Sequence, residues 1–191
     1  ISHPAKYRSP ALLLNLANKW KQLSPETEVI GLYLTPPADA RAAIREAGAE
    51  VVEGNVPADF AFEAMETACA RAELLATMGK KVLLCVYNLQ YATQTGDMQD
   101  AVRLLSVPAA YTNGGALTVA ATINVEALPT DKLGLLRGFA DCELALTADG
   151  GEWIPDFSLT GSVHESSEIA ALRAKAAQEG NRILFEQVTR L

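Results

Sequence analysis

A short basic loop near the start of the chain, HPAKYRSP, has residue types that could bind phosphate. It carries Lys6, Arg8 and Ser9, and Pro10 leads into the apolar segment ALLLNLANKW, which has helical spacing. Phosphate-binding loops use glycine amides, a lysine and a magnesium-binding hydroxyl. This loop has no glycine and no Gly-Lys-Ser/Thr sequence, so an ordinary loop in which Ser9 caps the following helix is favoured.

Other residue types that carry chemistry are few and scattered. His3 and His164 are the only histidines, and neither has the spacing of a metal ligand. Cys69, Cys85 and Cys142 are widely spaced in apolar surroundings, which predicts buried free thiols rather than disulfides or a zinc site. The chain also lacks the Gly-x-Ser-x-Gly and Gly-x-Gly-x-x-Gly signatures of common hydrolases and dinucleotide-binding proteins.

The composition is typical of one globular domain over residues 1–191. Hydrophobic residues make up 49% of the 191 positions and charged residues 20%. The net charge of −7 argues against a wholly basic nucleic-acid-binding surface but leaves room for a local basic patch. The sequence has no bilayer-length apolar run and no signal-peptide pattern, so we expect a cytoplasmic location and no membrane partner. Because Ile1 stands directly before a loop, the chain also fits a fragment of a longer protein.

The elements that would position a site alternate between strands and helices. Three apolar runs predict buried strands at 28–34, 82–87 and 116–125, and helical spacing predicts helices from residue 11, over 38–48 and after residue 59. This alternation predicts an α/β fold with a mostly parallel central sheet flanked by helices. The Asp149-Gly150-Gly151 turn predicts an antiparallel hairpin at the edge of that sheet. Such sheets bind ligands at the carboxyl ends of their strands.

Five segments in colinear order carry a family resemblance. They are PAKYRSPALLLNLA, ETACARAELLATMGKKVLLCVYNLQ, NGGALTVAATINV, LLRGFADCELALT and IPDFSLTGSVHES. Together they resemble the RecA-type ATPase domain of the Rho family of transcription termination factors, which are ring-forming, RNA-dependent helicases. The resemblance implies a RecA-like P-loop NTPase fold, and the family uses ATP and Mg²⁺.

The resemblance also assigns the residues of the phosphate-binding loop. The family's Gly-Lys-Thr falls on Arg8, Ser9 and Pro10, while Lys6 matches an earlier lysine on the near side of the loop. None of these residues supplies the glycine amide, the lysine charge and the hydroxyl that the family uses at those positions. A degenerate loop is therefore expected, although Arg8 could still hold an anion.

Three further catalytic positions lack their functional side chains. Tyr87 stands where the family has its magnesium-orienting aspartate, and we expect its ring to fill the space that nucleotide would occupy. Thr35 replaces the water-activating glutamate, and Val163 replaces the arginine finger that reaches a neighbouring subunit. We therefore predict no catalytic residues, no cofactor and no metal site.

One position could retain a function in RNA binding. The family has a lysine-glycine pair facing RNA in the loop before the CELALT-like strand, and this chain has Arg137 and Gly138 there. Arginine can bind phosphate, but Asp141 and Glu143 lower the local positive potential. An ordinary exposed loop arginine fits the sequence equally well.

These observations leave three hypotheses for function. The first is a Rho-like homologue that has lost ATP binding and hydrolysis and acts as a scaffold, a regulatory module or an RNA-associated module. The second is an active ATP-dependent RNA helicase or translocase with an atypical site, and the third is a protein-interaction domain without a nucleic-acid role. The expected partners are RNA, bound weakly, or a transcription-related protein. Without nucleotide and an arginine finger at subunit boundaries, we expect a monomer or small oligomer rather than a stable hexamer.

Overall fold

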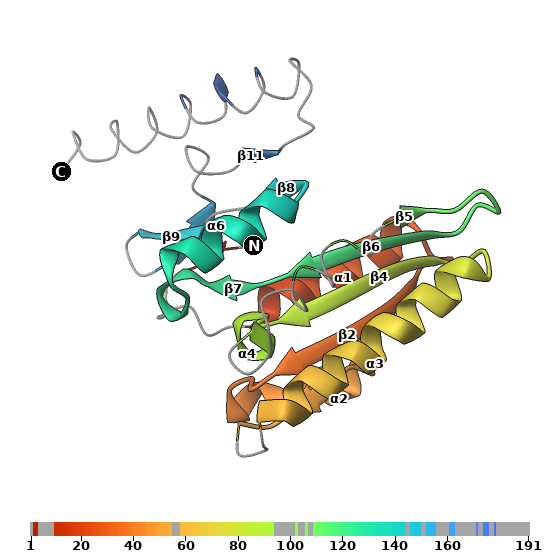
Figure 1. The fold of residues 1–191 in the computed structure, drawn as a ribbon, viewed down its shortest axis with the longest axis horizontal. Coiled ribbons are helices and arrows are strands. Elements are labelled where there is room, and N and C mark those ends of the chain that lie inside the picture. Colours follow the sequence, from red (N-terminus) through yellow and green to blue (C-terminus); the bar gives the residue numbers. More distant parts are fainter. Residues whose placement is uncertain are drawn as a thin grey trace.

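A five-stranded sheet with the strand order β3-β2-β4-β6-β5 forms the centre of the molecule (Figure 1). Its strands are β2 (Glu28–Leu34), β3 (Glu50–Val52), β4 (Lys81–Tyr87), β5 (Ala109–Ala110) and β6 (Ala116–Ala121). The first four in spatial order are parallel, and β5 is antiparallel to β6. The computed structural model describes residues 2–3, 10–54, 58–93, 102, 106, 109–143, 146–149, 152–155, 161–162, 171, 174–175 and 178.

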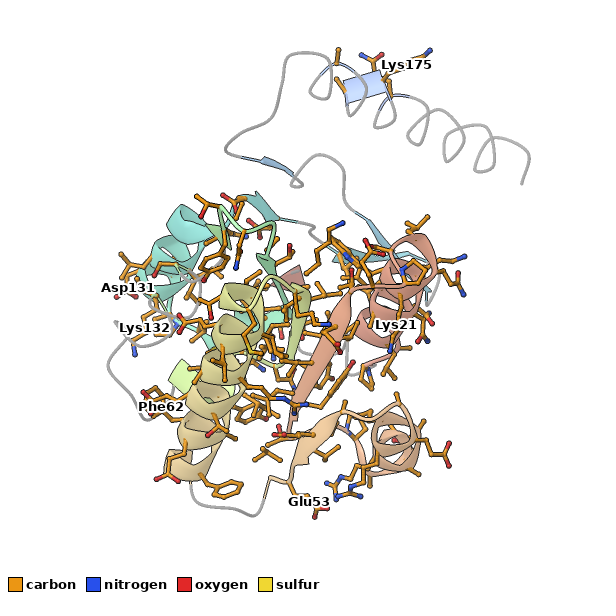
Figure 2. The ribbon with its side chains drawn as sticks, turned by 90° about the vertical axis from the view of Figure 1, so that its right-hand side faces the viewer. Lys21, Glu53, Phe62, Asp131, Lys132 and Lys175 are labelled. Atoms are coloured by element: carbon orange, nitrogen blue, oxygen red, sulfur yellow. The ribbon has the colours of Figure 1, made fainter. Side chains whose placement is uncertain are left out.

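Strand β4 lies at the centre because it can be buried on both faces. Its residues after Lys81 are all buried, as a run of apolar side chains in a parallel sheet predicts. Helix α3 (Ala58–Thr77) covers one face, and helices α1 (Ala11–Leu23) and α2 (Arg41–Glu46) cover the other. Figure 2 shows these layers from the side, with Phe62 of α3 and Lys21 of α1 on opposite sides of the sheet.

The two faces of the sheet have separate apolar cores. Alternate residues of β2 and β4, among them Leu32 and Leu84, pack with Met65 of α3. The residues between them, including Tyr33 and Tyr87, pack with Leu13 of α1 and Ile44 of α2. Because successive side chains of a strand point to opposite faces of the sheet, alternate residues pack against different helices.

The remaining elements lie around the carboxyl end of the sheet and beyond it. Short strand β1 (Ser2–His3) pairs in parallel with β7 (Ile123–Asn124), which follows β6. The other elements are η1 (Ala38–Ala40), α4 (Gln90–Thr93), η2 (Val125–Ala127), α6 (Thr130–Phe139), β8 (Cys142–Glu143), β9 (Leu146–Asp149), β10 (Glu152–Pro155) and β11 (Gly161–Ser162). Of the helices that the structure describes, none combines the length and the apolar character needed to cross a bilayer.

The predicted α/β fold is confirmed, and the three predicted strands are neighbours in one sheet. The position of the predicted hairpin is wrong. Strands β9 and β10 do form an antiparallel pair, but they make a separate two-stranded sheet. The antiparallel edge of the central sheet is β5 instead. The helical spacing of DMQDAVRLL (97–105) and of the segment from residue 166 onward also predicts helices, and these segments fall largely outside the described residues.

Candidate functional site

The carboxyl ends of β2 and β4 bring together two of the predicted site positions. Tyr33 is the register partner of Tyr87 at the end of β4, and Thr35 follows the last residue of β2. Pro10 lies directly before α1, which covers this part of the sheet. The structure therefore places Thr35, Tyr87 and Pro10 around one end of the sheet, as the strand order requires. Lys6, Arg8, Ser9 and Val163 lie outside the described residues.

Tyr87 is part of the apolar core on the α1 side of the sheet. Its side chain is 1% exposed, and its ring stacks on that of Tyr33 with the centroids 5.8 Å apart and the planes at 23°. Burial, with a smaller contribution from nearby Cys85, raises the pKa of the Tyr33 hydroxyl well above its usual range. A buried neutral ring at this position supplies neither the charge nor the exposed oxygen that a hydrated Mg²⁺ needs.

Thr35 has a backbone conformation that is uncommon for a β-branched residue. Its φ is +46°, and its backbone N–H donates to the Val52 carbonyl at 2.7 Å. Its Oγ1 atom is buried and has no hydrogen-bond partner among the residues that the structure describes. Pro36 and Pro37 follow directly, and Arg41 Nε donates to the Pro36 carbonyl at 3.3 Å. A neutral hydroxyl held in this way cannot act as the general base that a glutamate supplies.

Asn88, which follows Tyr87, connects the ends of three strands. Its φ is +61°, a conformation that asparagine tolerates better than most residues. Its Nδ2 donates to the Leu34 carbonyl at 3.1 Å, and its backbone N–H donates to Thr122 Oγ1 at 2.9 Å. Gln90 Oε1 accepts from the backbone N–H of Asn124 at 3.1 Å. These buried polar groups hold the strand ends together by internal hydrogen bonds.

Sequence reasoning missed this polar network. The run Tyr87-Asn88-Leu89-Gln90 after a buried strand is a weak signal for it, because asparagine favours a left-handed turn. The partner Thr122 lies 34 residues away in the NGGALTVAATINV segment, where no local pattern marks it as a partner of Asn88. Only the pairing of β4 with β6 brings the two residues together.

A carboxylate does lie near this end of the sheet, but arginines bind both of its oxygens. Glu53 follows β3, and its Oε2 lies 3.2 Å from Arg41 Nη1 while its Oε1 lies 3.1 Å from Arg45 Nη2. In the described part of the chain, no three histidine, cysteine or acidic side chains gather closely enough to bind a metal ion. Among the described residues at this end of the sheet, Glu53 is thus already paired, and Thr35 and Tyr87 supply no charge to a metal ion.

Arg137 and Gly138 lie in the last turn of helix α6, not in the loop that the resemblance implied. The segment TDKLGLLRGF buries Leu133 and Leu136, and this apolar spacing extends the helix through the pair. Arg137 Nε and Nη2 donate to Glu143 Oε1 at 3.0 and 2.9 Å. Its guanidinium is thus engaged by a carboxylate rather than presented alone to a phosphate.

Comparison with known proteins identifies the fold but not the family. No family model and no curated protein matches the chain. Among the solved structures that match is the assembled ATPase EscN of the type III secretion system of enteropathogenic E. coli, with a TM-score of 0.72 and 16% sequence identity. The match covers 98% of this chain and 55% of EscN, so the chain spans about half the length of that protein. The RecA-like fold is confirmed, whereas membership of the Rho family stays a prediction.

Proposed function

We propose that this chain is a RecA-fold domain that has lost ATP binding and hydrolysis and acts as a scaffold or regulatory module. The placement of Tyr87 carries the proposal. Its ring is buried against Tyr33 at the position where the Rho resemblance assigns a magnesium-orienting carboxylate. An active site there would need that core to open and a different side chain to supply the charge.

Two further features support the loss of catalysis. Thr35 replaces the water-activating glutamate with a buried hydroxyl, and the Leu34–Thr35 peptide group that precedes it is fixed by bonds to Val52 and Asn88. Pro10 begins α1 without a backbone N–H, so one of the amides that a helix start can offer to phosphate is missing.

The finer proposal is a Rho-like domain that contacts a transcription-related protein. The five colinear segments support the Rho assignment, and the ion pair of Arg137 with Glu143 favours a protein partner over RNA. A single arginine already paired with a carboxylate adds little affinity for an RNA backbone, because each phosphate contact must first break that pair.

ATP turnover measured with and without polypyrimidine RNA tests the loss of activity. We expect turnover at the background rate in both cases, and the same rate for the Arg8→Ala variant. RNA-stimulated turnover that Arg8→Ala abolishes would overturn the proposal and favour an active RNA translocase.

RNA binding measured across salt concentrations tests the choice of partner. We expect no binding at physiological salt and no difference between the wild type and Arg137→Ala. Salt-dependent binding that Arg137→Ala weakens would instead assign the domain an RNA-associated role.

A further inference from the structure

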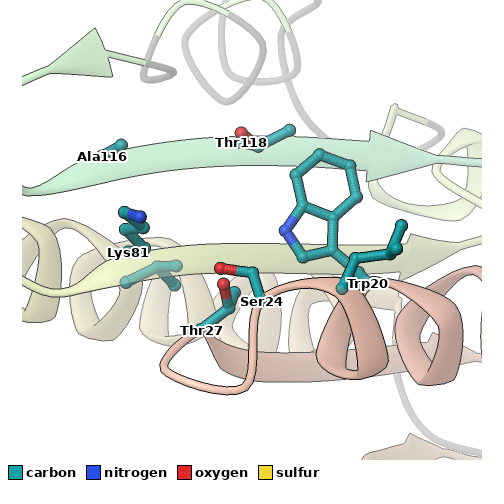
Figure 3. A pocket seen from close by; sticks show the side chains of 8 residues that line it. Trp20, Ser24, Thr27, Lys81, Ala116 and Thr118 are labelled. Carbon is teal, nitrogen blue, oxygen red and sulfur yellow. The ribbon is translucent and has the colours of Figure 1, made fainter.

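A pocket of about 350 Å³ lies at the opposite, amino-terminal end of the sheet. It is enclosed by the end of α1, the turn into β2 and the first residues of β4 and β6 (Figure 3). Lys81 lines it at the start of β4, six residues and therefore about 20 Å from Tyr87. The pocket is thus separate from the candidate nucleotide site, and its volume falls within the range of small-molecule sites.

The walls of the pocket are largely apolar. Trp20 and Leu23 come from the last turns of α1 and are 36% and 86% exposed, while Ala116 and Thr118 come from the α1-facing side of β6. Helix α1 packs over β4, whereas the helix that packs on β6 is α3, from the opposite face of the sheet. The open space beside Trp20 can therefore accept an apolar body of the size of an aromatic ring.

A hydrogen-bond donor faces this space. Figure 3 shows the indole nitrogen of Trp20 on the side that faces Lys81 and Ser24. The indole N–H has no hydrogen-bond partner among the side chains and carbonyls of the described part of the chain. A ligand with an acceptor oxygen could satisfy this donor while its apolar body covers Ala116.

The charges at the rim of the pocket balance one another. Lys81 Nζ donates to Glu26 Oε1 at 2.8 Å, and Ser24 Oγ donates to the same oxygen at 2.7 Å. These bonds hold the pKa of Glu26 at about 2, so its carboxylate is charged at neutral pH. Glu26 does not line the pocket, but it pairs with Lys81, which does. An anionic ligand would have to displace this carboxylate from Lys81, and a cationic ligand would meet the Lys81 ammonium, which favours a neutral ligand.

We propose that this pocket binds a small neutral aromatic carbonyl compound. The ring lies over Ala116 and Thr118, and the carbonyl oxygen accepts a hydrogen bond from the indole N–H of Trp20. This site does not depend on the proposed loss of ATPase activity, since it uses none of the same residues.

Titration of the ¹⁵N-labelled protein with benzamide tests the proposal through the indole N–H signals of Trp20 and Trp153. The Trp153→Phe variant assigns the two signals. We expect a saturable shift of the Trp20 signal and an unchanged Trp153 signal. Toluene, which lacks the carbonyl, and benzoate, which is charged, should each bind about three- to tenfold more weakly than benzamide. Equal or tighter binding of either compound would overturn the assigned chemistry.

Two pocket-filling variants locate the binding site. Ala116→Leu and Thr118→Ile should each weaken benzamide binding at least about tenfold, because the added carbon atoms occupy the space of the ring. Ala43→Leu on the exposed side of α2 is the matched control and should bind like the wild type. No saturable shift in the wild type, parallel shifts of both tryptophan signals, or unchanged binding in both pocket variants would overturn the proposal.

Discussion

Tyr33 and Tyr87 form a stacked aromatic pair at the carboxyl end of the sheet, and this pair determines whether a metal ion could bind there. Their rings are register partners on adjacent strands, and both are buried beneath α1. A stacked aromatic pair adds about 0.5–1.5 kcal/mol beyond the burial of its surface. A carboxylate in the same place would lie in an apolar core, where an unpaired charge is strongly disfavoured. This position therefore stabilises the fold and does not favour metal binding.

Replacement of Tyr87 by aspartate should destabilise the protein without creating activity. We expect Tyr87→Asp to lower the free energy of unfolding by about 3–5 kcal/mol, because it removes a large buried ring and buries a carboxylate. Tyr87→Phe keeps the ring and is the matched control, with an expected loss below about 1.5 kcal/mol. Urea denaturation followed by circular dichroism measures both. A stable Tyr87→Asp variant with Mg²⁺-dependent ATP hydrolysis would contradict this view of the site.

Cys85 should make the stability fall at alkaline pH. Burial raises the pKa of its thiol from the ordinary 9.0 to about 12, so above pH 9 the unfolded state loses a proton that the folded state keeps. The contribution of Cys85 is complete below pH 9 and declines by about 1.4 kcal/mol per pH unit above it.

The slope of stability against pH isolates this effect. Urea denaturation between pH 9 and 10.5 should show a shallower decline for Cys85→Ala than for the wild type, whatever their stabilities at pH 7. Equal slopes would show that the thiol ionises as readily in the folded protein as in the unfolded chain.

At the scale of the elements, long apolar segments were predictable and short or polar ones were not. Strands β2, β4 and β6 and helices α1 and α3 follow from runs of apolar residues with the appropriate period. Strand β5 consists of Ala109 and Ala110, which are exposed and have no strand-like pattern, so the true antiparallel edge could not be predicted. The network around Asn88 depends on a partner 34 residues away, which local patterns do not indicate. Trp20 shares the apolar spacing of α1, which predicts a buried side chain. It is instead partly exposed and lines the pocket near the carboxyl end of α1.

The turn before β6 requires a glycine at position 115. A Cβ atom there would overlap the carbonyl oxygen of Ala76 at the end of α3. We expect Gly115→Ala to cost at least about 1–3 kcal/mol, because backbone atoms rather than a flexible side chain must move. Gly134→Ala in α6 is the control: its Cβ would meet nothing within 4 Å, and alanine favours a helix by roughly 0.5–1 kcal/mol. Thermal denaturation compares the two variants, and similar effects of both would contradict this packing.

At the scale of the whole molecule, a chain can have this fold without having the catalytic residues. The chain shares the RecA-like fold of EscN over almost its whole length at 16% identity. The described ends of β2 and β4 nevertheless have a threonine and a buried tyrosine at the positions that the Rho resemblance assigns to catalysis. A fold of this kind can persist because its two apolar cores stabilise it without nucleotide.

The assembly state follows from the same proposal. Rings of the Rho family use nucleotide and an arginine finger at each subunit boundary, so a chain without them should stay a monomer or small oligomer. Size-exclusion chromatography with light scattering, with and without ATP and Mg²⁺, measures the mass. We expect one mass of at most a few copies of the 20.4 kDa chain under both conditions. A stable hexamer in the absence of nucleotide would contradict the expectation.

Calorimetric titration with a non-hydrolysable ATP analogue and Mg²⁺ tests the loss of the nucleotide site most directly. The remaining basic residues could offer a few charge-assisted contacts of about 1.5–3 kcal/mol each, most of which the cost of association offsets. We therefore predict a dissociation constant of roughly millimolar or weaker, unchanged by Mg²⁺. Low-micromolar, Mg²⁺-dependent binding that Arg8→Ala abolishes would contradict the account and show that the site still functions.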